Sequence, residues 1–304
     1  MKYVILLLLL PICMACTEKS RCYTDFVIHQ DTLWRLDFKG HIFPVDLKTN
    51  QEILHPLLNW DNAIAITCDN VGHLITCDNN NNIKRISLAQ NTLDQLYTCP
   101  GIVTGITCDR QNNIYIITQS GIVDLNSQHT YAPDTFAIPL PWKRRPQFIM
   151  DQEDNIWLGF NMDGQRGDVY IFNTKDKIFF QPDFGNLDMA HQPIVSLFTG
   201  NSSREVYGTS TYINGDVITN NLIQFYQHTG KVLTDTSEDI KLKTGVCYKD
   251  QIYIGNSLGG ITKWVKGKWS VVVPAGNKII DKIYADDRTL IYLTRDGKLN
   301  FKNL

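Results

Sequence analysis

The chain has 304 residues, of which 43% are hydrophobic and 20% are charged, and its formal net charge is -2. This balance is typical of a globular protein with a buried core and excludes a chain that is disordered throughout. A near-neutral charge also disfavours DNA or RNA binding, which needs a basic surface to meet the phosphates.

The first residues have the pattern of an export signal. Lys2 precedes an apolar run from Val4 to Ile12, which is well short of the roughly 20 residues that a membrane-spanning helix needs. Cys16 closes this segment after a small residue, and polar residues follow it. The arrangement resembles the lipobox of bacterial lipoproteins, in which the cysteine is lipidated and becomes the new N-terminus. We therefore expect a signal peptide over residues 1–15 and lipid attachment at Cys16, with a plain cleaved signal or an uncleaved anchor as alternatives.

The rest of the chain is a repeat. Seven segments share one plan: an apolar strand, a turn rich in Asp and Asn, a second strand centred on an aromatic or Ile residue, and a third strand after a Gly or Asn turn. The central residues of the second strands are Trp34, Ile75, Tyr115, Trp157, Tyr207, Tyr253 and Ile291. They lie 38 to 50 residues apart, which is typical of propeller blades. Helical repeats are excluded because turn residues recur every eight to twelve positions.

These repeats predict an all-β fold, a β-propeller of seven four-stranded blades, with six or eight blades as the nearest alternatives. The copy at 154–159 reads Asp-Asn-Ile-Trp-Leu-Gly, and the copy at 113–122 is the next clearest. Both resemble the periplasmic propeller repeats of two-component regulators, whose signature is an Asp, a short turn and an apolar-Trp-apolar-Gly strand. In that family the propeller usually sits on a membrane sensor with a kinase. We find no kinase segment here and expect the module, without the signalling role, to carry over.

The seventh repeat supplies only three strands, the last of them within residues 297–304. Residues 20–24 precede the first blade and are the available donor of a fourth strand. Such closure removes an exposed sheet edge that would invite aggregation. We therefore expect residues 16–24 to form the lipidated terminus, tether and closing strand, and residues 25–304 to form a single propeller domain.

Six cysteines lie outside the signal segment: Cys22, Cys68, Cys77, Cys99, Cys108 and Cys247. Their spacings match no disulfide scaffold or zinc pattern. Cys68 and Cys108 occupy the same register in two repeats, which indicates buried strand positions. We expect structural thiols, with one or more disulfides as the alternative in an exported chain.

The acidic residues in the turns have a structural explanation, because Asx side chains bond to nearby backbone and tolerate left-handed geometry. We expect this role for Asp69, Asp109, Asp151 and Asp154. Residues 151–154 also lack the spacing of an EF-hand loop. The segment 226–233 resembles one strand and turn of quinoprotein-like propellers, but it occurs once. We predict no metal site and no cofactor.

Candidate binding residues gather where propellers place function. The loops from second to third strands and the connections between blades share one face around the central channel, and the larger insertions flank Tyr207 on that face. Residues 142–145 combine a Trp with basic side chains that suit carboxylate, sulfate or phosphate, the alternative being a stiffened, solvated linker. The ligand-binding candidates are Trp60, Trp142, Arg144, Arg145, Asp163, Arg166, His191 and Tyr212.

No motif of a metalloprotease, a serine-nucleophile hydrolase or a P-loop enzyme is present, so we predict no catalytic residues. The favoured hypothesis is a non-catalytic module of the cell envelope, periplasmic or surface-exposed. It would bind a glycan or protein partner on its loops, touch the membrane through its N-terminal lipid only, and bind no nucleic acid. One alternative is a polysaccharide-cleaving glycosidase or lyase that uses loop carboxylates such as Asp61, Asp163, Asp168 or Asp216. Another is a scaffold subunit of an envelope complex.

Overall fold

The computed structural model describes residues 22–49, 51–53, 62–87, 89–90, 92–133, 142, 145–162, 164, 166–184, 192–214, 216–236 and 241–304. Every regular element in these ranges is a β-strand. Within them, no helix has the length and hydropathy to span a membrane.

The strands fall into seven sheets, which are the blades of the propeller. Blade 1 contains β1 (Tyr23–His29), β2 (Thr32–Asp37), β3 (Ile42–Asp46) and β4 (Gln51–Glu52). Blade 2 contains β5 (Ala63–Cys68), β6 (Leu74–Asp78), β7 (Asn82–Ser87) and β8 (Thr92–Thr98). Blade 3 contains β9 (Val103–Cys108), β10 (Ile114–Thr118), β11 (Gly121–Asp124) and β12 (His129–Tyr131). Blade 4 contains β13 (Gln147–Met150), β14 (Asn155–Asn161), β15 (Gly167–Asn173) and β16 (Ile178–Phe180).

The second half of the ring follows the same plan. Blade 5 contains β17 (Ile194–Thr199), β18 (Glu205–Asn214), β19 (Val217–Tyr226) and β20 (Thr229–Thr236). Blade 6 contains β21 (Leu242–Tyr248), β22 (Gln251–Asn256), β23 (Ile261–Val265) and β24 (Lys268–Val273). Blade 7 contains β25 (Ile280–Ala285), β26 (Thr289–Thr294) and β27 (Leu299–Asn303).

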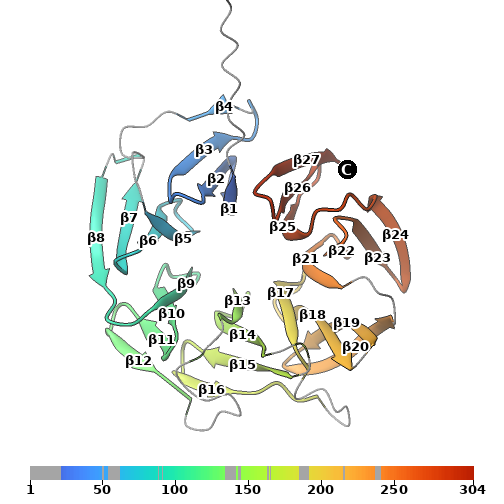
Figure 1. The fold of residues 1–304 in the computed structure, drawn as a ribbon. Helices are drawn as coiled ribbons and strands as arrows, with labels where there is room; N and C mark the ends of the chain where they lie inside the picture. The colour runs from blue at the N-terminus through green and yellow to red at the C-terminus, as the bar shows by residue number, and fades with distance from the viewer. Residues whose placement is uncertain are drawn as a thin grey trace, which may run out of the picture.

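The blades follow one another around a ring in chain order, with the first strand of each blade nearest the centre (Figure 1). Each sheet is an antiparallel meander in which consecutive strands pair. All seven central residues predicted from the repeat lie in the second strand of their blade, and none is more than 7% exposed. The predicted seven-bladed β-propeller is therefore confirmed.

The hydrophobic core is divided into seven clusters, each between two neighbouring blades. Trp157 of blade 4, for example, packs against Phe225 of blade 5 with ring centroids 5.1 Å apart. The last cluster joins the two ends of the chain, because Phe26 and Leu33 of blade 1 share it with Ile291 of blade 7. The ring is thus closed by apolar packing as well as by chain order.

The acidic turn residues hold the turns between first and second strands, as predicted. Asp151 accepts hydrogen bonds from the backbone N–H groups of Glu153 and Asn155, both at 2.8 Å, and from Trp157 Nε1 at 2.8 Å. Asp69 and Asp109 accept the same pair of backbone bonds in blades 2 and 3. One carboxylate therefore fixes both the turn and the start of the next strand.

These turns also join neighbouring blades. Asp154 has a φ of 63° and its carboxylate receives the Arg110 guanidinium of blade 3, with Nε to Oδ1 at 3.1 Å and a second nitrogen to Oδ2 at 3.0 Å. The backbone N–H of Asn70 in blade 2 donates to Asn112 Oδ1 of blade 3 at 2.8 Å. Further pairs link the following blades: Gln152 with Gly200, Asn201 with Asp250, and Lys249 with Asp287.

The seam between blades 7 and 1 differs from the expected strand closure. Tyr23 and Thr24 lie in β1, the innermost strand of blade 1, so they do not form a fourth strand of blade 7. Residues 20 and 21 lie outside the described residues, as do the predicted signal peptide and Cys16. Besides the apolar packing, polar contacts cross the seam: Tyr23 N–H donates to the Gly297 carbonyl at 2.8 Å, and Lys282 forms an ion pair with Asp25 at 2.5 Å.

The described cysteines form no disulfide in this structure. Burial raises the pKa of Cys68, Cys77 and Cys108 to about 12, and that of Cys247 to about 11. Thiols with such pKa values remain protonated at neutral pH and are poor nucleophiles. They are structural side chains, in line with the prediction.

Replacing Trp157 with Ala should lower the free energy of unfolding by about 3–5 kcal/mol, because it leaves a cavity between blades 4 and 5. Trp157→Phe keeps most of the packing and loses the bond to Asp151, so it should cost only about 1–2 kcal/mol. Denaturant unfolding followed by circular dichroism measures both. Tyr226→Ala, at a side chain that is 48% exposed, is the control and should cost under about 1 kcal/mol. Equal losses from Trp157→Ala and the control would contradict the assigned core.

Candidate functional site

One face of the ring collects the irregular parts of the chain. The first strand of each blade begins there and the second strand ends there, so the turns from second to third strands and the connections between blades share it. We call it the loop face. The Asp-capped turns between first and second strands lie on the opposite face.

A β-bulge recurs where the first strands begin at the loop face. In six blades the pairing with the second strand skips one residue of the first strand. The skipped residues are Thr24, Ile64, Thr104, Val195, Lys243 and Asp281. In blade 4, Pro146 precedes the first paired residue, and proline has no N–H to donate to a ladder. Bulges re-aim side chains and are common at barrel rims and beside active sites.

The charged bulge residues Lys243 and Asp281 line a cavity of about 310 Å³ on the loop face, at the ends of the innermost strands of their blades. Its walls come from blades 4 to 7, and we call it the axial cavity. Its lining residues are Arg145, Gln147, Gly159, Asn161, Ile194, Val195, Lys243, Asp281 and Arg295. Three cations therefore face one carboxylate in a small polar hollow.

The cations differ in their partners. Arg295 donates to Asp281 at 2.8 Å, so these two side chains neutralise each other. Among the described residues, no carboxylate lies within ion-pair distance of Arg145 or Lys243. The cavity therefore keeps an excess of positive charge that is available to an anion.

Hydrogen bonds of the two residues before Lys243 fix the position of its backbone. Leu242 N–H donates to Asn220 Oδ1 of blade 5 at 3.2 Å, and Lys241 exchanges bonds with Ser257 of its own blade. Burial lowers the pKa of Lys243, and the positive charges of Arg295 and Lys241 lower it further, against the opposing effect of Asp281. An anion in the axial cavity would relieve this repulsion.

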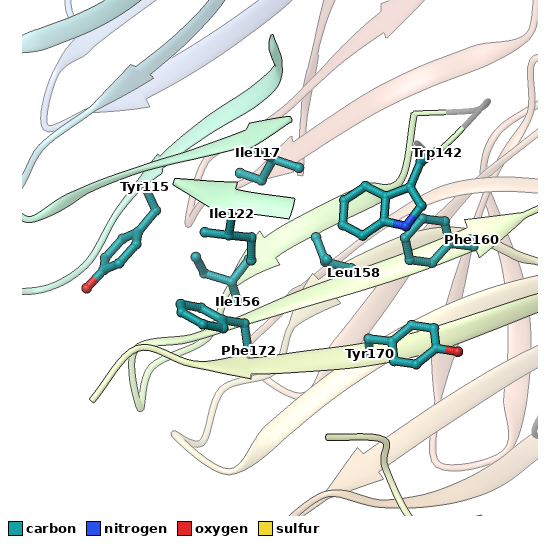
Figure 2. Packing of buried hydrophobic residues seen from close by; sticks show 9 residues of the cluster. All are labelled: Tyr115, Ile117, Ile122, Trp142, Ile156, Leu158, Phe160, Tyr170 and Phe172. Atoms are coloured by element: carbon teal, nitrogen blue, oxygen red, sulfur yellow. The ribbon is translucent and has the colours of Figure 1, made fainter. Parts of the chain in front are cut away.

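Trp142 has a different role from the one its sequence context suggested. Its ring is 1% exposed and packs edge-on against Phe160 with centroids 5.0 Å apart, within the cluster between blades 3 and 4 (Figure 2). The backbone N–H of Trp142 also donates to the Gln119 carbonyl at 2.8 Å. The ring face is thus closed to a ligand, and Trp142 anchors the connection whose last residues bring Arg145 to the axial cavity.

Two other candidates lie on neighbouring loops of the loop face. Arg166 is exposed and ends a loop that is closed by a bond from Met162 N–H to the Arg166 carbonyl at 2.8 Å. Tyr212 lies half-buried in β18, next to Ile213, whose N–H donates to the Gly164 carbonyl at 2.8 Å. The loop of blade 4 and the long hairpin of blade 5 are therefore in contact, but neither candidate lines the axial cavity.

The remaining candidates Trp60, Arg144, Asp163 and His191 lie outside the described residues, as does Asp61. Asp168, considered above as a loop acid, is 1% exposed and accepts bonds from Tyr170 at 2.7 Å and Gln181 at 2.8 Å. It is a structural carboxylate with both oxygens engaged. Asp216 is exposed in the turn of the blade 5 hairpin. In the ranges that the structure describes, no three His, Cys, Asp or Glu side chains are grouped to hold a metal ion.

The sequence reading missed Lys243, Asp281 and Arg295. The first two carried a usable signal, because the bulge residue precedes the central residue of its second strand by ten to twelve positions in each of the six bulged blades. Aligning the repeats and comparing the residue at this position in each of them would have grouped Lys243 with Asp281. Arg295 has no such mark, since it follows β26 in an ordinary turn.

Comparison with known proteins establishes the fold alone. No family model and no curated protein matches the sequence. Among solved structures, Kuenenia stuttgartiensis hydrazine synthase aligns over 94% of this chain and 96% of its own, with 12% identity and a TM-score of 0.71. The Cps50 (Swd1) β-propeller domain of Myceliophteria thermophila aligns over 94% and 98%, with 12% identity and a TM-score of 0.66.

A third similar structure is the extracellular domain of the putative hybrid two-component system BT4673 from B. thetaiotaomicron. It has 15% identity and a TM-score of 0.65, and the alignment covers 94% of this chain but 38% of that one. These three proteins have different roles, and identities this low transfer none of them.

The lowered pKa of Lys243 predicts that its amine reacts with acetic anhydride at lower pH than the amine of the exposed Lys268. Acylation needs the neutral amine, so the pH midpoint of labelling follows the pKa. Arg295→Ala removes a nearby positive charge and releases Asp281, and both changes should move the Lys243 midpoint upward. Mass spectrometry of labelled peptides gives each midpoint, and Lys298→Ala is the control that should leave it in place. A Lys243 midpoint at or above that of Lys268 would contradict the assigned surroundings.

Proposed function

We propose that this chain is an exported, lipid-anchored propeller of the cell envelope that binds an anionic ligand or protein partner at its loop face without transforming it. The observation that carries the binding role is the axial cavity, where Arg145 and Lys243 have no described carboxylate partner. The export signal and the lipobox resemblance at Cys16 support the location. BT4673, with its extracellular domain, is a precedent for this fold outside the cell.

The ligand chemistry follows from the lining. Arg145 offers a planar guanidinium that can hold a carboxylate, sulfate or phosphate through two hydrogen bonds, and Lys243 adds a compact charge. Gln147 and Asn161 supply amides that can bond the hydroxyl groups of a sugar or the backbone of a peptide. An acidic glycan and an acidic segment of a protein both present such groups, and they are the two ligand classes we propose.

Among the described residues, the axial cavity has one carboxylate, Asp281, and it is paired with Arg295. Hydrolysis of a glycosidic bond usually needs two carboxyl groups on opposite sides of that bond. The described lining is therefore suited to holding an anion rather than to cleaving a polysaccharide.

The binding role predicts a rise in melting temperature with uronic-acid oligosaccharides, sulfated oligosaccharides or an Asp-rich peptide, and none with neutral maltooligosaccharides. The double variant R145M/K243M should keep the unliganded melting temperature within about 2 °C and lose most of the ligand-induced rise. Differential scanning fluorimetry measures both, and chromatography of the glycans monitors turnover. Product formation would favour the enzyme alternative. An unchanged melting temperature with all of these anionic ligands would overturn the two proposed ligand classes.

The anchor predicts that the chain fractionates with membranes and that its mature N-terminal peptide carries fatty acyl groups on Cys16. Cys16→Ser should abolish the lipid and leave the signal uncleaved, whereas Cys13→Ser should change neither. Mass spectrometry of the N-terminal peptide is the measurement. An unmodified peptide that begins at another residue would show a plain cleaved signal.

A further inference from the structure

We infer that the axial cavity binds the phosphate headgroup of an anionic lipid in the membrane that anchors the chain. This inference rests on the proposed lipid anchor, and it goes beyond the two ligand classes named above by assigning a third, a membrane lipid, to the same site. Three features of the molecule support it: the place where the chain joins the ring, the length of the tether, and the charge of the cavity.

The chain joins the ring on the loop face, close to the axial cavity. Cys22 precedes β1, and Tyr23 N–H is bonded to the carbonyl of Gly297 in the turn after β26. The same turn contains Arg295, which lines the cavity. Lys282, the neighbour of the cavity residue Asp281, is ion-paired with Asp25 of β1 at 2.5 Å. The N-terminus is therefore attached beside the site rather than at the outer rim or on the opposite face.

The tether is too short to move the site far from the lipid. Six residue steps separate Cys16 from Cys22, and an extended chain advances at most about 3.3–3.6 Å per residue, which gives a reach of about 20 Å. Strands of six residues make the ring about 20 Å thick. The opposite face therefore lies about 20 Å farther from the attachment point of the tether than the loop face does. The tether thus holds the point where the chain joins the loop face within about 20 Å of the lipid, whereas the opposite face lies farther away by the thickness of the ring.

The positive charge of the axial cavity then favours an anionic lipid as the partner. Arg145 and Lys243 add positive charge beside a surface that is negative wherever anionic lipids are present. On the opposite face, Arg110 and Lys249 are ion-paired with Asp154 and Asp287 across blade boundaries, and the exposed Lys175 and Lys266 lie in separate outer turns rather than together in one cavity. Exposed apolar side chains occur on both faces, with Phe38 on the loop face and Val71 on the other, so they do not decide the orientation. The loop face therefore combines proximity with uncompensated positive charge.

The first test uses the whole lipidated protein, reconstituted into vesicles of phosphatidylcholine alone or with 30% phosphatidylglycerol. Acetic anhydride labelling of Lys243 should slow several-fold in the vesicles with phosphatidylglycerol, while labelling of Lys268 on the outer strand β24 stays the same. Equal labelling of Lys243 in both vesicle types would overturn the inference. A protein that stays out of both vesicle types would show that the anchor itself is wrong, which is a separate failure.

The second test removes the lipid. All seven core clusters lie within residues 22–304, so the polypeptide 17–304 contains the complete described ring. It should cosediment with vesicles containing phosphatidylglycerol, and R145M/K243M should bind about 30-fold more weakly, as expected for two cations at about 1 kcal/mol each. The matched control K231M/K268M removes two exposed cations outside the cavity and should bind as the parent does.

Equal weakening in the two variants would show diffuse attraction and overturn the headgroup site. Binding of soluble uronic-acid oligosaccharides or the Asp-rich peptide without vesicle binding would overturn the lipid ligand and leave the proposed binding function intact. If the protein bound neither the vesicles nor any soluble anion, both the lipid ligand and the proposed binding function would be overturned.

Discussion

Each sheet of this protein has two apolar faces, and the fold depends on burying both. A sheet in the middle of an open row would find a neighbour on each side, but the first and last sheets would not. The ring solves this, because Phe26 and Leu33 of blade 1 meet Ile291 of blade 7 in the same kind of cluster that joins every other pair of blades. Circular closure is therefore an energetic requirement of the sequence, since without it two sheet faces would remain in water.

The two faces of the ring differ in how many of their polar groups stabilise the closed ring. On the opposite face, carboxylates such as Asp151 cap the turns, and pairs such as Arg110 with Asp154 join blade to blade. The polar groups of that face are largely used in holding the structure. On the loop face the ladders end in bulges, the connections vary in length, and Lys243 reaches the axis with a lowered pKa. Among the described residues, the loop face contributes fewer of these stabilising contacts and places cations without a carboxylate partner together in one cavity.

The sequence was sufficient for the architecture because the repeat is carried by residues that pack. Trp34, Trp157 and Tyr253 mark the second strand in separate blades, and their burial follows from their size and spacing. The turn acids were equally readable, since Asp69 and Asp109 recur with the same local chemistry. Local and repeated features of this kind can be recognised from the sequence alone.

The site was harder to predict because it is assembled across four blades. Arg145, Lys243 and Arg295 are far apart in the chain, and only the ring brings them together. Trp142 was misleading for the opposite reason. An aromatic ring beside arginines suggests a binding surface, yet its neighbours in space are Phe160 and the core, which the local sequence does not reveal. The closing strand expected from residues 20–24 is not formed by Tyr23 and Thr24, because both lie in β1, where Tyr23 pairs with Asp37 of blade 1 and Thr24 is the bulge residue.

The bulges have a consequence for how this fold diversifies. A bulged residue such as Lys243 or Asp281 projects its side chain but contributes no rung to its ladder, so exchanging it leaves the pairing of the blade unchanged. The six bulge positions form a set that mutation can change with little effect on folding. A propeller with 12% identity to this chain still aligns with it at a TM-score of 0.71. In this architecture, specificity and stability are encoded at different positions and can evolve separately.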